Sequence, residues 1–182
     1  MSELQHPLRK HMRSHVTRTT PCPGCGIGLV SQAVLWAVED LGMDMDDFIF
    51  VSGIGCSAWI PTPLFKADTL HTTHGRRIAF ANGVKAGRPD KKVVVISGDG
   101  DLSSIGGNHL IHGARRNIDL TVILVNNAIY GMTGGHAAPT TPRDTRTVTS
   151  PYGCAEHDFD LAALVTAAGA PYVARWTTAH PV

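Results

Sequence analysis

The chain has 182 residues, 43% of them hydrophobic, which is a length and composition typical of one globular domain with its own core. Lys and Arg together number 16, Asp and Glu 15, and the formal net charge is only +1. Such a balance argues against a nucleic-acid-binding or membrane-surface protein.

Basic residues gather at the N-terminus, where residues 2–18 carry four Lys or Arg side chains and three histidines. No apolar run that could form a signal core follows them. We therefore expect residues 1–19 to form a basic, extended arm, or a packing surface for another subunit, ahead of a single domain over residues 20–182. The sequence contains no run of about 18 apolar residues, which is the length needed to cross a membrane. A cytoplasmic location is expected, and four cysteines without a secretory signal argue against a disulfide framework.

Helical and strand patterns alternate along the rest of the chain. Apolar residues at helical spacing and their stop signals predict helices over residues 27–41, 77–86, 102–116 and 161–168. β-branched and apolar runs predict strands over residues 48–51, 93–96, 121–125 and 172–176. Gly, Thr and Pro fill residues 130–151 and predict a long loop. This alternation predicts an α/β fold, with an open, mostly parallel sheet and helices on both faces.

Two of the predicted strands end in polar residues. The motif Gly98-Asp99-Gly100 follows one strand, and Asn126-Asn127 follows the next. The carboxyl ends of parallel strands line the crevice where ligands bind. Carboxylate and amide oxygens suit Mg²⁺, which usually keeps a diphosphate as partner, and the glycines allow close backbone approach. The pattern predicts a metal-diphosphate site, with two ordinary β-turns as the alternative.

Three of the four cysteines suggest a metal or cluster. Cys22 and Cys25 form a CxxC motif in a turn rich in Gly and Pro, a geometry that brings two thiolates onto one soft metal. A thioredoxin-like redox pair and a zinc knuckle are alternatives. Cys56 follows the first predicted strand at the same sheet edge as the diphosphate site, which favours an iron-sulfur cluster near an organic cofactor. An inert, buried Cys56 is the other interpretation.

Five motifs occur in a fixed order: CPGCG, SGIGCS, THGR, GDGD and NNxxYGMTGG. Together they resemble the β subunit of 2-oxoacid:ferredoxin oxidoreductases, and the similarity covers nearly everything from Pro21 to Pro181. The resemblance implies a thiamine-diphosphate-binding fold with thiamine diphosphate, Mg²⁺ and a [4Fe-4S] cluster as cofactors. It implies oxidative decarboxylation of a 2-oxoacid to acyl-CoA and CO₂, with electrons passed to ferredoxin. Among substrates 2-oxoglutarate is favoured, followed by pyruvate, branched-chain oxoacids and indolepyruvate.

The resemblance also implies site residues. Mg²⁺ would be bound by Asp99, Asn127 and the backbone carbonyl of Ile129. Diphosphate contacts would come from Gly100, Asp101, Gly131 and Met132. The rest of the cofactor would be contacted by Ile54, Gly55, Cys56, Ser57 and His74. The cluster would be ligated by Cys22, Cys25 and Cys56. A surface position for His74, core packing by Met132 and helix N-capping by Asp101 are the structural alternatives.

The sequence departs from the family in three ways. The fourth cluster cysteine lies in a C-terminal segment of the family, and this segment is expected to be missing after Val182; Cys154 or a partner could substitute. His136 stands where the family commonly carries Gln. The glutamates are Glu3, Glu39 and Glu156, and none is predicted at the cofactor edge. The glutamate that activates thiamine is therefore expected from a partner α subunit in a hetero-oligomer.

Two other functions remain open from the residues. A non-redox thiamine-dependent decarboxylase or synthase would use the same GDG and NN motifs without needing cysteines at the crevice. A non-catalytic assembly subunit would hold a structural metal at the CxxC motif and would not bind thiamine diphosphate with Mg²⁺.

Overall fold

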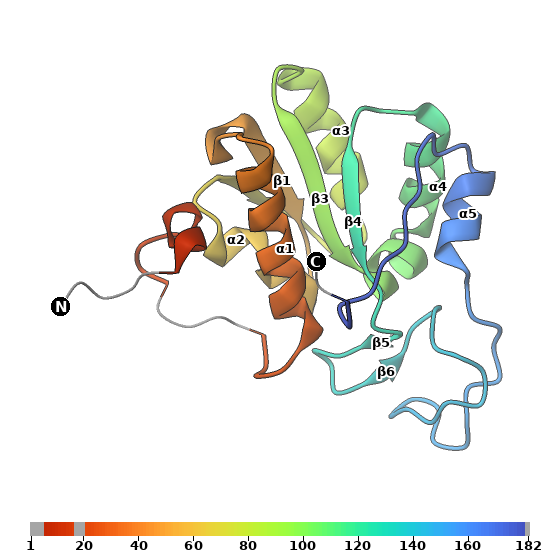
Figure 1. The fold of residues 1–182 in the computed structure, drawn as a ribbon. Coiled ribbons are helices and arrows are strands. Elements are labelled where there is room, and N and C mark those ends of the chain that lie inside the picture. Colours follow the sequence, from red (N-terminus) through yellow and green to blue (C-terminus); the bar gives the residue numbers. More distant parts are fainter. Residues whose placement is uncertain (1–5, 17–20, 181–182) are drawn as a thin grey trace.

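A four-stranded parallel sheet forms the centre of the molecule (Figure 1). The structure, a computed structural model, describes residues 6–16 and 21–180. The strands are β1 (Phe48–Ser52), β2 (Asp68–His71), β3 (Lys92–Gly98) and β4 (Thr121–Val125), in the order β2-β1-β3-β4. Every neighbouring pair is parallel. The predicted α/β class is thus confirmed.

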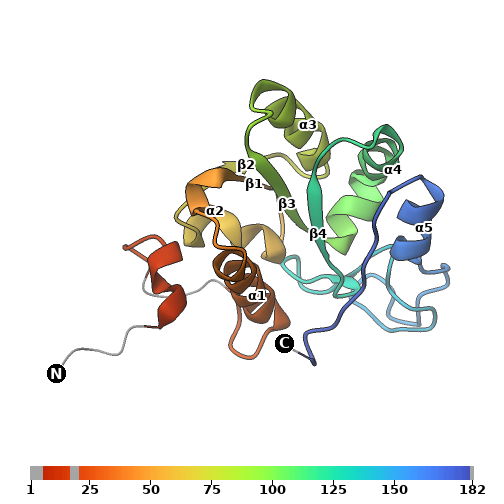
Figure 2. The ribbon, with the colours of Figure 1, turned by 45° about the horizontal axis from the view of Figure 1, so that its top comes forward.

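Helices cover both faces of this sheet, as Figures 1 and 2 show from two directions. The helices on the two faces are α1 (Gly26–Asp40), α2 (Pro61–Leu64), α3 (Arg77–Gly87) and α4 (Gly107–Arg116). A fifth helix, α5 (Leu161–Ala167), packs on the outside of α4. A short antiparallel pair, β5 (Ile129–Tyr130) and β6 (His136–Ala137), overlaps the first half of the predicted loop of residues 130–151.

Alternate residues of β3 point into two separate hydrophobic cores. Val94 and Ile96 pack in a cluster with residues of α1 and α2, whereas Val93 and Val95 pack in a cluster with residues of α3 and α4. All four valine and isoleucine side chains are buried. Burial on both faces explains why the strand reads as a continuous β-branched run rather than as an alternation of polar and apolar residues.

The segment between β3 and α4 is helical from its first residue. Residues 99 and 100 are already helical, Asp101–Ile105 form a π-helical segment, and α4 follows after Gly106. The main-chain N–H of Gly106 donates to the carbonyl of Asp101 at 3.0 Å, the five-residue spacing of a π-helix. The helical backbone thus begins directly at the end of β3, one of the two inner strands of the sheet.

The N-terminal segment is not an extended arm over the residues that the structure describes. Pro7–His11 form a short 3₁₀-helix, and Leu8 is buried in the core cluster beneath α1. Glu39 of α1 forms ion pairs with Lys10 and His11, both at 2.7 Å. Predicted arm residues 1–5 and 17–19 lie outside the described residues.

The predicted strand over residues 172–176 is wrong, because this segment has no regular structure. Two of its aromatic side chains, Tyr172 and Trp176, are largely exposed. Figures 1 and 2 both draw this segment passing beside β4, but β4 pairs only with β3. An apolar run needs a hydrogen-bonded neighbour to become a strand, and this one has none among the described residues.

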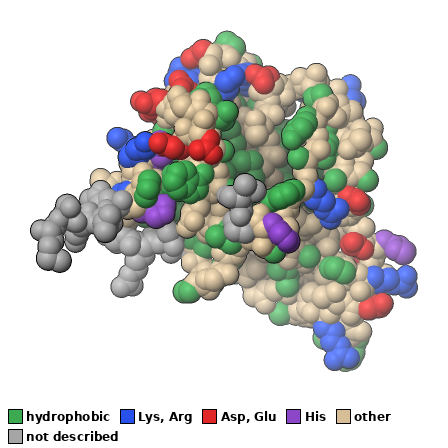
Figure 3. All heavy atoms as spheres, in the orientation of Figure 1, with side chains coloured by type: hydrophobic (Ala, Val, Ile, Leu, Met, Phe, Trp, Pro, Cys, Tyr) green, Lys and Arg blue, Asp and Glu red, His purple; other side chains and the backbone are tan. Residues whose placement is uncertain are grey.

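Acidic and basic side chains are interspersed on the face shown in Figure 3, in line with the balanced net charge. None of the helices in the described part of the chain is long and apolar enough to cross a membrane.

Candidate functional site

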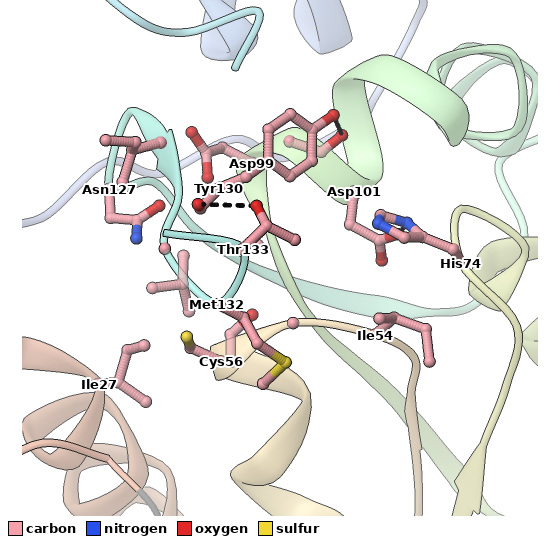
Figure 4. A pocket seen from close by; sticks show the side chains of 17 residues that line it. Ile27, Ile54, Cys56, His74, Asp99, Asp101, Asn127, Tyr130, Met132 and Thr133 are labelled. Atoms are coloured by element: carbon pink, nitrogen blue, oxygen red, sulfur yellow. Dashed lines mark hydrogen bonds and ion pairs between the residues drawn. The ribbon is translucent and has the colours of Figure 1, made fainter. Parts of the chain in front are cut away.

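A pocket lies where the segments after β1, β3 and β4 meet (Figure 4). The strand order reverses between β1 and β3, since β2 lies on one side of β1 and β3 on the other. In open α/β sheets, ligands bind at the carboxyl ends of the strands next to such a reversal. On one side of the pocket lie Asp99 and Asn127, and on the other lie His74 and Asp101. The fold therefore creates the predicted crevice at the predicted strand ends.

Three oxygen atoms converge at one side of the pocket. The side-chain amide of Asn127 lies against two acceptors, the main-chain carbonyl of Ile129 and Oδ1 of Asp99, and its nitrogen donates a hydrogen bond to each when the amide is turned over. The amide atom at this position lies 2.9 Å from both. Facing oxygens repel each other unless the amide turns over to donate two hydrogen bonds or a cation lies among them. Oxygens at Mg²⁺ distances of about 2.0–2.1 Å, at right angles, are themselves about 2.9 Å apart.

A sharp turn brings two of these oxygens together. Ala128, between Asn127 and Ile129, has a φ of 58°, the left-handed region that few residues other than glycine adopt. The side chain of Asn126 accepts a hydrogen bond from the Ala128 N–H at 3.1 Å and so stabilises this turn. The turn aims the Asn127 side chain and the Ile129 carbonyl at the same point, which Asp99 reaches from β3.

Main-chain N–H groups are available beside these oxygens. The helical run that begins at residue 99 leaves its first N–H groups without helical partners, and the helix dipole favours an anion there. Gly100 is required at this point, because a Cβ on it would lie 2.5 Å from the ring of Tyr130. The Tyr130 hydroxyl donates to the Gly100 carbonyl at 2.8 Å. An anion such as diphosphate fits this helix start next to a divalent cation.

The carboxylate of Asp101 is turned away from the predicted diphosphate position. It is buried, accepts a hydrogen bond from the Gly75 N–H at 2.6 Å, forms an ion pair with Arg77 and contacts Nδ1 of His74. Ser97 donates a further hydrogen bond to it at 3.1 Å. The N-cap of the helical segment is Gly100, and the Asp101 carboxylate accepts its hydrogen bonds from Gly75 and Ser97 instead of from the helix. Its side chain is thus committed to the protein, and only its main-chain N–H remains for a ligand.

Burial lowers the pKa of both basic side chains that contact Asp101. Arg77 is completely buried, and burial lowers the pKa of its guanidinium to about 10. Burial, and then the charge of Arg77, hold the pKa of His74 below its usual value of 6.5. His74 therefore faces the pocket as a neutral ring at neutral pH.

The cysteines lie in one neighbourhood but are not gathered around a point. Cys25 and Cys56 pack against the same core cluster, and Cys22 is exposed. Burial raises the pKa of the Cys56 thiol, and the charges of Cys25 and Cys22 raise it further. Within residues 6–16 and 21–180, no three His, Cys, Asp or Glu side chains are placed to hold a metal ion. Cys154 is buried in the loop before α5, where its main-chain atoms bond to Thr145 and Asp144.

Most of the predicted site residues line the pocket together. They are Ile54, Gly55, Cys56, Ser57, His74, Asp99, Gly100, Asp101, Asn127, Ile129, Gly131 and Met132. Cys22 and Cys25 do not line it. The sequence prediction missed Tyr130, although it lies inside the NNxxYGMTGG motif, and it missed Arg77, next to the THGR motif. Ile27 and Thr133 also line the pocket and carried no chemical signal.

No glutamate of the described residues lines the pocket. Glu39 lies on α1, where Lys10 and His11 lower the pKa of its carboxyl through hydrogen bonds. Glu156 is exposed in the loop before α5. Glu3 lies outside the described residues. The pocket thus contains the groups for a cation and an anion, without a glutamate from the described chain.

A family comparison fits this geometry. Residues 53–181 match the family described as "Thiamine pyrophosphate enzyme, C-terminal TPP binding domain", and the chain therefore belongs to this family of thiamine-pyrophosphate-binding domains. Within it, the chain is similar to named subunits. It is 58% identical over 177 residues, 97% of its length, to the "2-oxoglutarate synthase subunit KorB" of Methanocaldococcus jannaschii. It is 42% identical over 155 residues, 85% of its length, to the "2-oxoacid:ferredoxin oxidoreductase subunit beta" of Saccharolobus solfataricus.

A solved structure has the same fold. The 2-oxoglutarate:ferredoxin oxidoreductase from Magnetococcus marinus, with 2-oxoglutarate, coenzyme A and succinyl-CoA bound, aligns with a TM-score of 0.86 at 38% identity. The alignment covers 94% of this chain and 57% of that one. The chain also spans only 65% of the Methanocaldococcus subunit and 51% of the Saccharolobus subunit. These similarities confirm the resemblance to β subunits of 2-oxoacid:ferredoxin oxidoreductases.

Proposed function

We propose that the chain is the thiamine-diphosphate-binding part of the β subunit of a 2-oxoglutarate:ferredoxin oxidoreductase. The reaction is the oxidative decarboxylation of 2-oxoglutarate to its acyl-CoA and CO₂, with electrons passed to ferredoxin. The observation that carries the proposal is the convergence of the Asp99 carboxylate, the Asn127 side-chain amide and the Ile129 carbonyl beside a helix start. The names of the similar proteins from Methanocaldococcus and Magnetococcus support the choice of 2-oxoglutarate.

Magnesium would be bound by the three converging oxygens, with diphosphate oxygens and water as further ligands. The donor set fits Mg²⁺, since all three are hard oxygens and only one carries a formal charge. The main-chain N–H groups of Gly100 and Asp101 would hold the diphosphate, together with Gly131 and Met132 on the opposite side of the pocket. Ile54, Gly55, Cys56 and Ser57 would line the rest of the cofactor, with their segment after β1 facing it across the crevice.

Thiamine diphosphate, when bound, supplies the nucleophilic carbon and the electron sink that decarboxylation of a 2-oxoacid requires. This chain's own residues orient the cofactor and exclude water. His74 presents a neutral imidazole on one side of the pocket, held by Asp101. The apolar side chains of Ile54 and Met132 are both partly exposed and lie at the pocket. Their exposure suits closure of the site by another protein surface.

An iron-sulfur cluster would be bound by Cys22, Cys25 and Cys56 in this proposal. Thiolates are its usual ligands, and the three cysteines lie in one neighbourhood, with Cys25 and Cys56 on a shared core. The end of the described chain lies there too, since a Cβ on Gly26 would be 2.9 Å from Oγ1 of Thr178. The thiols would need to move closer together to ligate a cluster, and the exposed turn of Cys22 allows this.

The α subunit of the same enzyme would complete the site. It would provide the glutamate that the pocket lacks among the described residues, and it would cover Ile54 and Met132. Coenzyme A, the 2-oxoacid and ferredoxin are the remaining partners in this proposal. We place the enzyme in the cytoplasm, where four free cysteines are stable.

The test is anaerobic co-purification of the full-length protein with its neighbouring subunits, followed by analysis of thiamine, magnesium, iron and sulfide. We expect thiamine diphosphate and iron together, with 2-oxoglutarate-dependent and CoA-dependent reduction of ferredoxin. Asp99→Ala should abolish Mg²⁺-dependent retention of the cofactor, whereas the exposed Asp158→Ala should not change it. Decarboxylation without iron would instead indicate a non-redox thiamine enzyme. Failure of the wild-type protein to bind thiamine diphosphate with Mg²⁺ would indicate an assembly subunit.

A further inference from the structure

Two consecutive threonines lie buried behind the converging oxygens. Thr140 and Thr141 follow β6 in a loop, yet they are only 4% and 1% exposed. Threonines in loops are mostly exposed, and a buried hydroxyl must find a hydrogen-bond partner. Both hydroxyls bond to the segments that supply the three oxygens.

Thr140 bonds to one oxygen of the Asp99 carboxylate. Its hydroxyl donates to Oδ2, while Oδ1 is the oxygen that faces Asn127 and the Ile129 carbonyl. Asp99 itself is 1% exposed, so water does not compete for Oδ2. The hydroxyl of Ser103 donates to the main-chain carbonyl of Asp99 at 2.7 Å and fixes the backbone there. The carboxylate is thus held so that one defined oxygen points to the site.

Thr141 supports the turn on the other side of the site. Its hydroxyl donates to the Ala128 carbonyl at 2.6 Å and accepts from the Ala138 N–H at 2.8 Å. Ala128 is the residue with positive φ between the two oxygen donors of the turn. Neighbouring residues of one loop therefore bond to the β3 side and the β4 side of the site at once, and they fix the separation between the two sides.

We propose that Thr140 is a positioning residue that makes Asp99 a one-oxygen ligand and thereby selects Mg²⁺ over Ca²⁺ at this site. The inference rests on the proposed magnesium site. Mg²⁺ requires near-ideal octahedral geometry with single oxygens, whereas Ca²⁺ accepts six to eight ligands and readily takes both oxygens of a carboxylate. A hydrogen bond that occupies Oδ2 removes the second oxygen from reach of a cation. Partners that orient a ligand in this way typically change metal affinity by about 10- to 100-fold when they are removed.

The experiment uses the purified assembly that contains this chain, stripped of divalent cations. Retention of thiamine diphosphate is measured by equilibrium dialysis against rising Mg²⁺ or Ca²⁺, so that the readout is binding and not turnover. In Thr140→Val we expect the Mg²⁺ concentration for half-maximal retention to rise by about 10- to 100-fold, with a smaller rise or a fall for Ca²⁺. Thr140→Ser keeps the hydroxyl and should keep the wild-type ratio between the Mg²⁺ and Ca²⁺ concentrations that give half-maximal retention. Thr145→Val, at an exposed position of the same loop, is the matched control.

A merely structural role for Thr140 would weaken both cations equally, and an unchanged Mg²⁺ to Ca²⁺ ratio in Thr140→Val would overturn the inference. If Thr140→Val does not fold, Thr140→Ala and Thr140→Ser provide the same comparison between a missing and a retained hydroxyl. A wild-type protein that retains no cofactor with either cation would instead contradict the proposed function itself. The two failures are therefore distinguishable.

Discussion

The guanidinium group of Arg77 fills the space that a side chain at position 53 would occupy. A Cβ on Gly53 would lie 2.5 Å from Cζ of Arg77. Gly53 directly follows β1, and Arg77 is the first residue of α3. The contact therefore connects β1 with α3, two elements that β2 separates in the sequence. The absence of a side chain at one residue is what allows a buried cation at the other to reach Asp101.

Gly53→Ala should therefore destabilise the protein. The added methyl group must displace a fully buried guanidinium, and overpacking of this kind costs roughly 1–3 kcal/mol. The free energy of unfolding is measured by urea denaturation. Gly83→Ala is the control, because a Cβ at Gly83 in α3 meets nothing within 4 Å and alanine favours helix by up to about 1 kcal/mol. Equal midpoints for Gly53→Ala and wild type would contradict the packing described here.

The pKa of His74 predicts a pH dependence of stability. Since burial and Arg77 hold this pKa below 6.5, the folded state binds fewer protons than the unfolded state as the pH falls through this range. The contribution of neutral His74 to the free energy of unfolding is thus fully present above pH 6.5. It is lost as the pH falls below 6.5 towards the lowered pKa of the folded state. An NMR titration of the ring gives the pKa directly. The slope of stability between pH 7 and 5 should be smaller in His74→Asn, and an unaltered slope would refute the assignment.

Thiol reactivity should follow exposure and the shifted pKa of Cys56. In protein prepared without iron, iodoacetamide at pH 8 should modify the exposed Cys22 severalfold faster than Cys56, whose thiol is partly buried and has a raised pKa. Cys154, 5% exposed, should react last. Mass spectrometry of peptides gives the order. In an anaerobic, iron-containing preparation, joint protection of Cys22, Cys25 and Cys56 would support the proposed cluster, and modification of all three at unchanged rates would count against it.

Tyr130→Phe should have a small and specific effect. It keeps the ring that packs over Gly100 and removes only the hydroxyl that donates to the Gly100 carbonyl, so we expect a loss of about 1 kcal/mol in the free energy of unfolding. Gly100→Ala should cost more, because its Cβ would collide with the ring at 2.5 Å. Comparison of the two urea midpoints checks this order, and a larger loss in Tyr130→Phe than in Gly100→Ala would reverse it.

Much of the fold could be predicted because the spacing of apolar residues along the sequence reflects which side chains are buried. The helix predicted over residues 27–41 is α1, one residue displaced, and the runs before Gly98 and Asn126 are β3 and β4. β2 was missed, since Asp68–His71 is short and carries no apolar pattern. The wrong strand over residues 172–176 was an apolar run that has no sheet partner in the described part of the chain.

Some residues of the candidate site could likewise be predicted from the sequence, and others could not. Asp99 and Asn127 could be predicted because a strand carries each to a known edge of the sheet. Thr140 could not, because a threonine among many in a Thr- and Pro-rich loop gives no sign of which segment it will contact. Arg77 begins a helix, where a long basic side chain is normally exposed, and only the fold brings Gly53 and Asp101 to it.

The π-helical segment Asp101–Ile105 sets the rotation of α4 relative to the residues at the end of β3. Each residue of an α-helix turns the chain by about 100°, so a single inserted residue rotates everything before it relative to everything after it. At the start of the segment, Asp101 must point to Arg77; after the segment, Leu110 must point into the core. Deletion of Ser104 would leave an uninterrupted α-helix that can satisfy only one of the two. The extra residue therefore allows one continuous helical run to place a charged side chain against Arg77 at its start and an apolar side chain in the core further along.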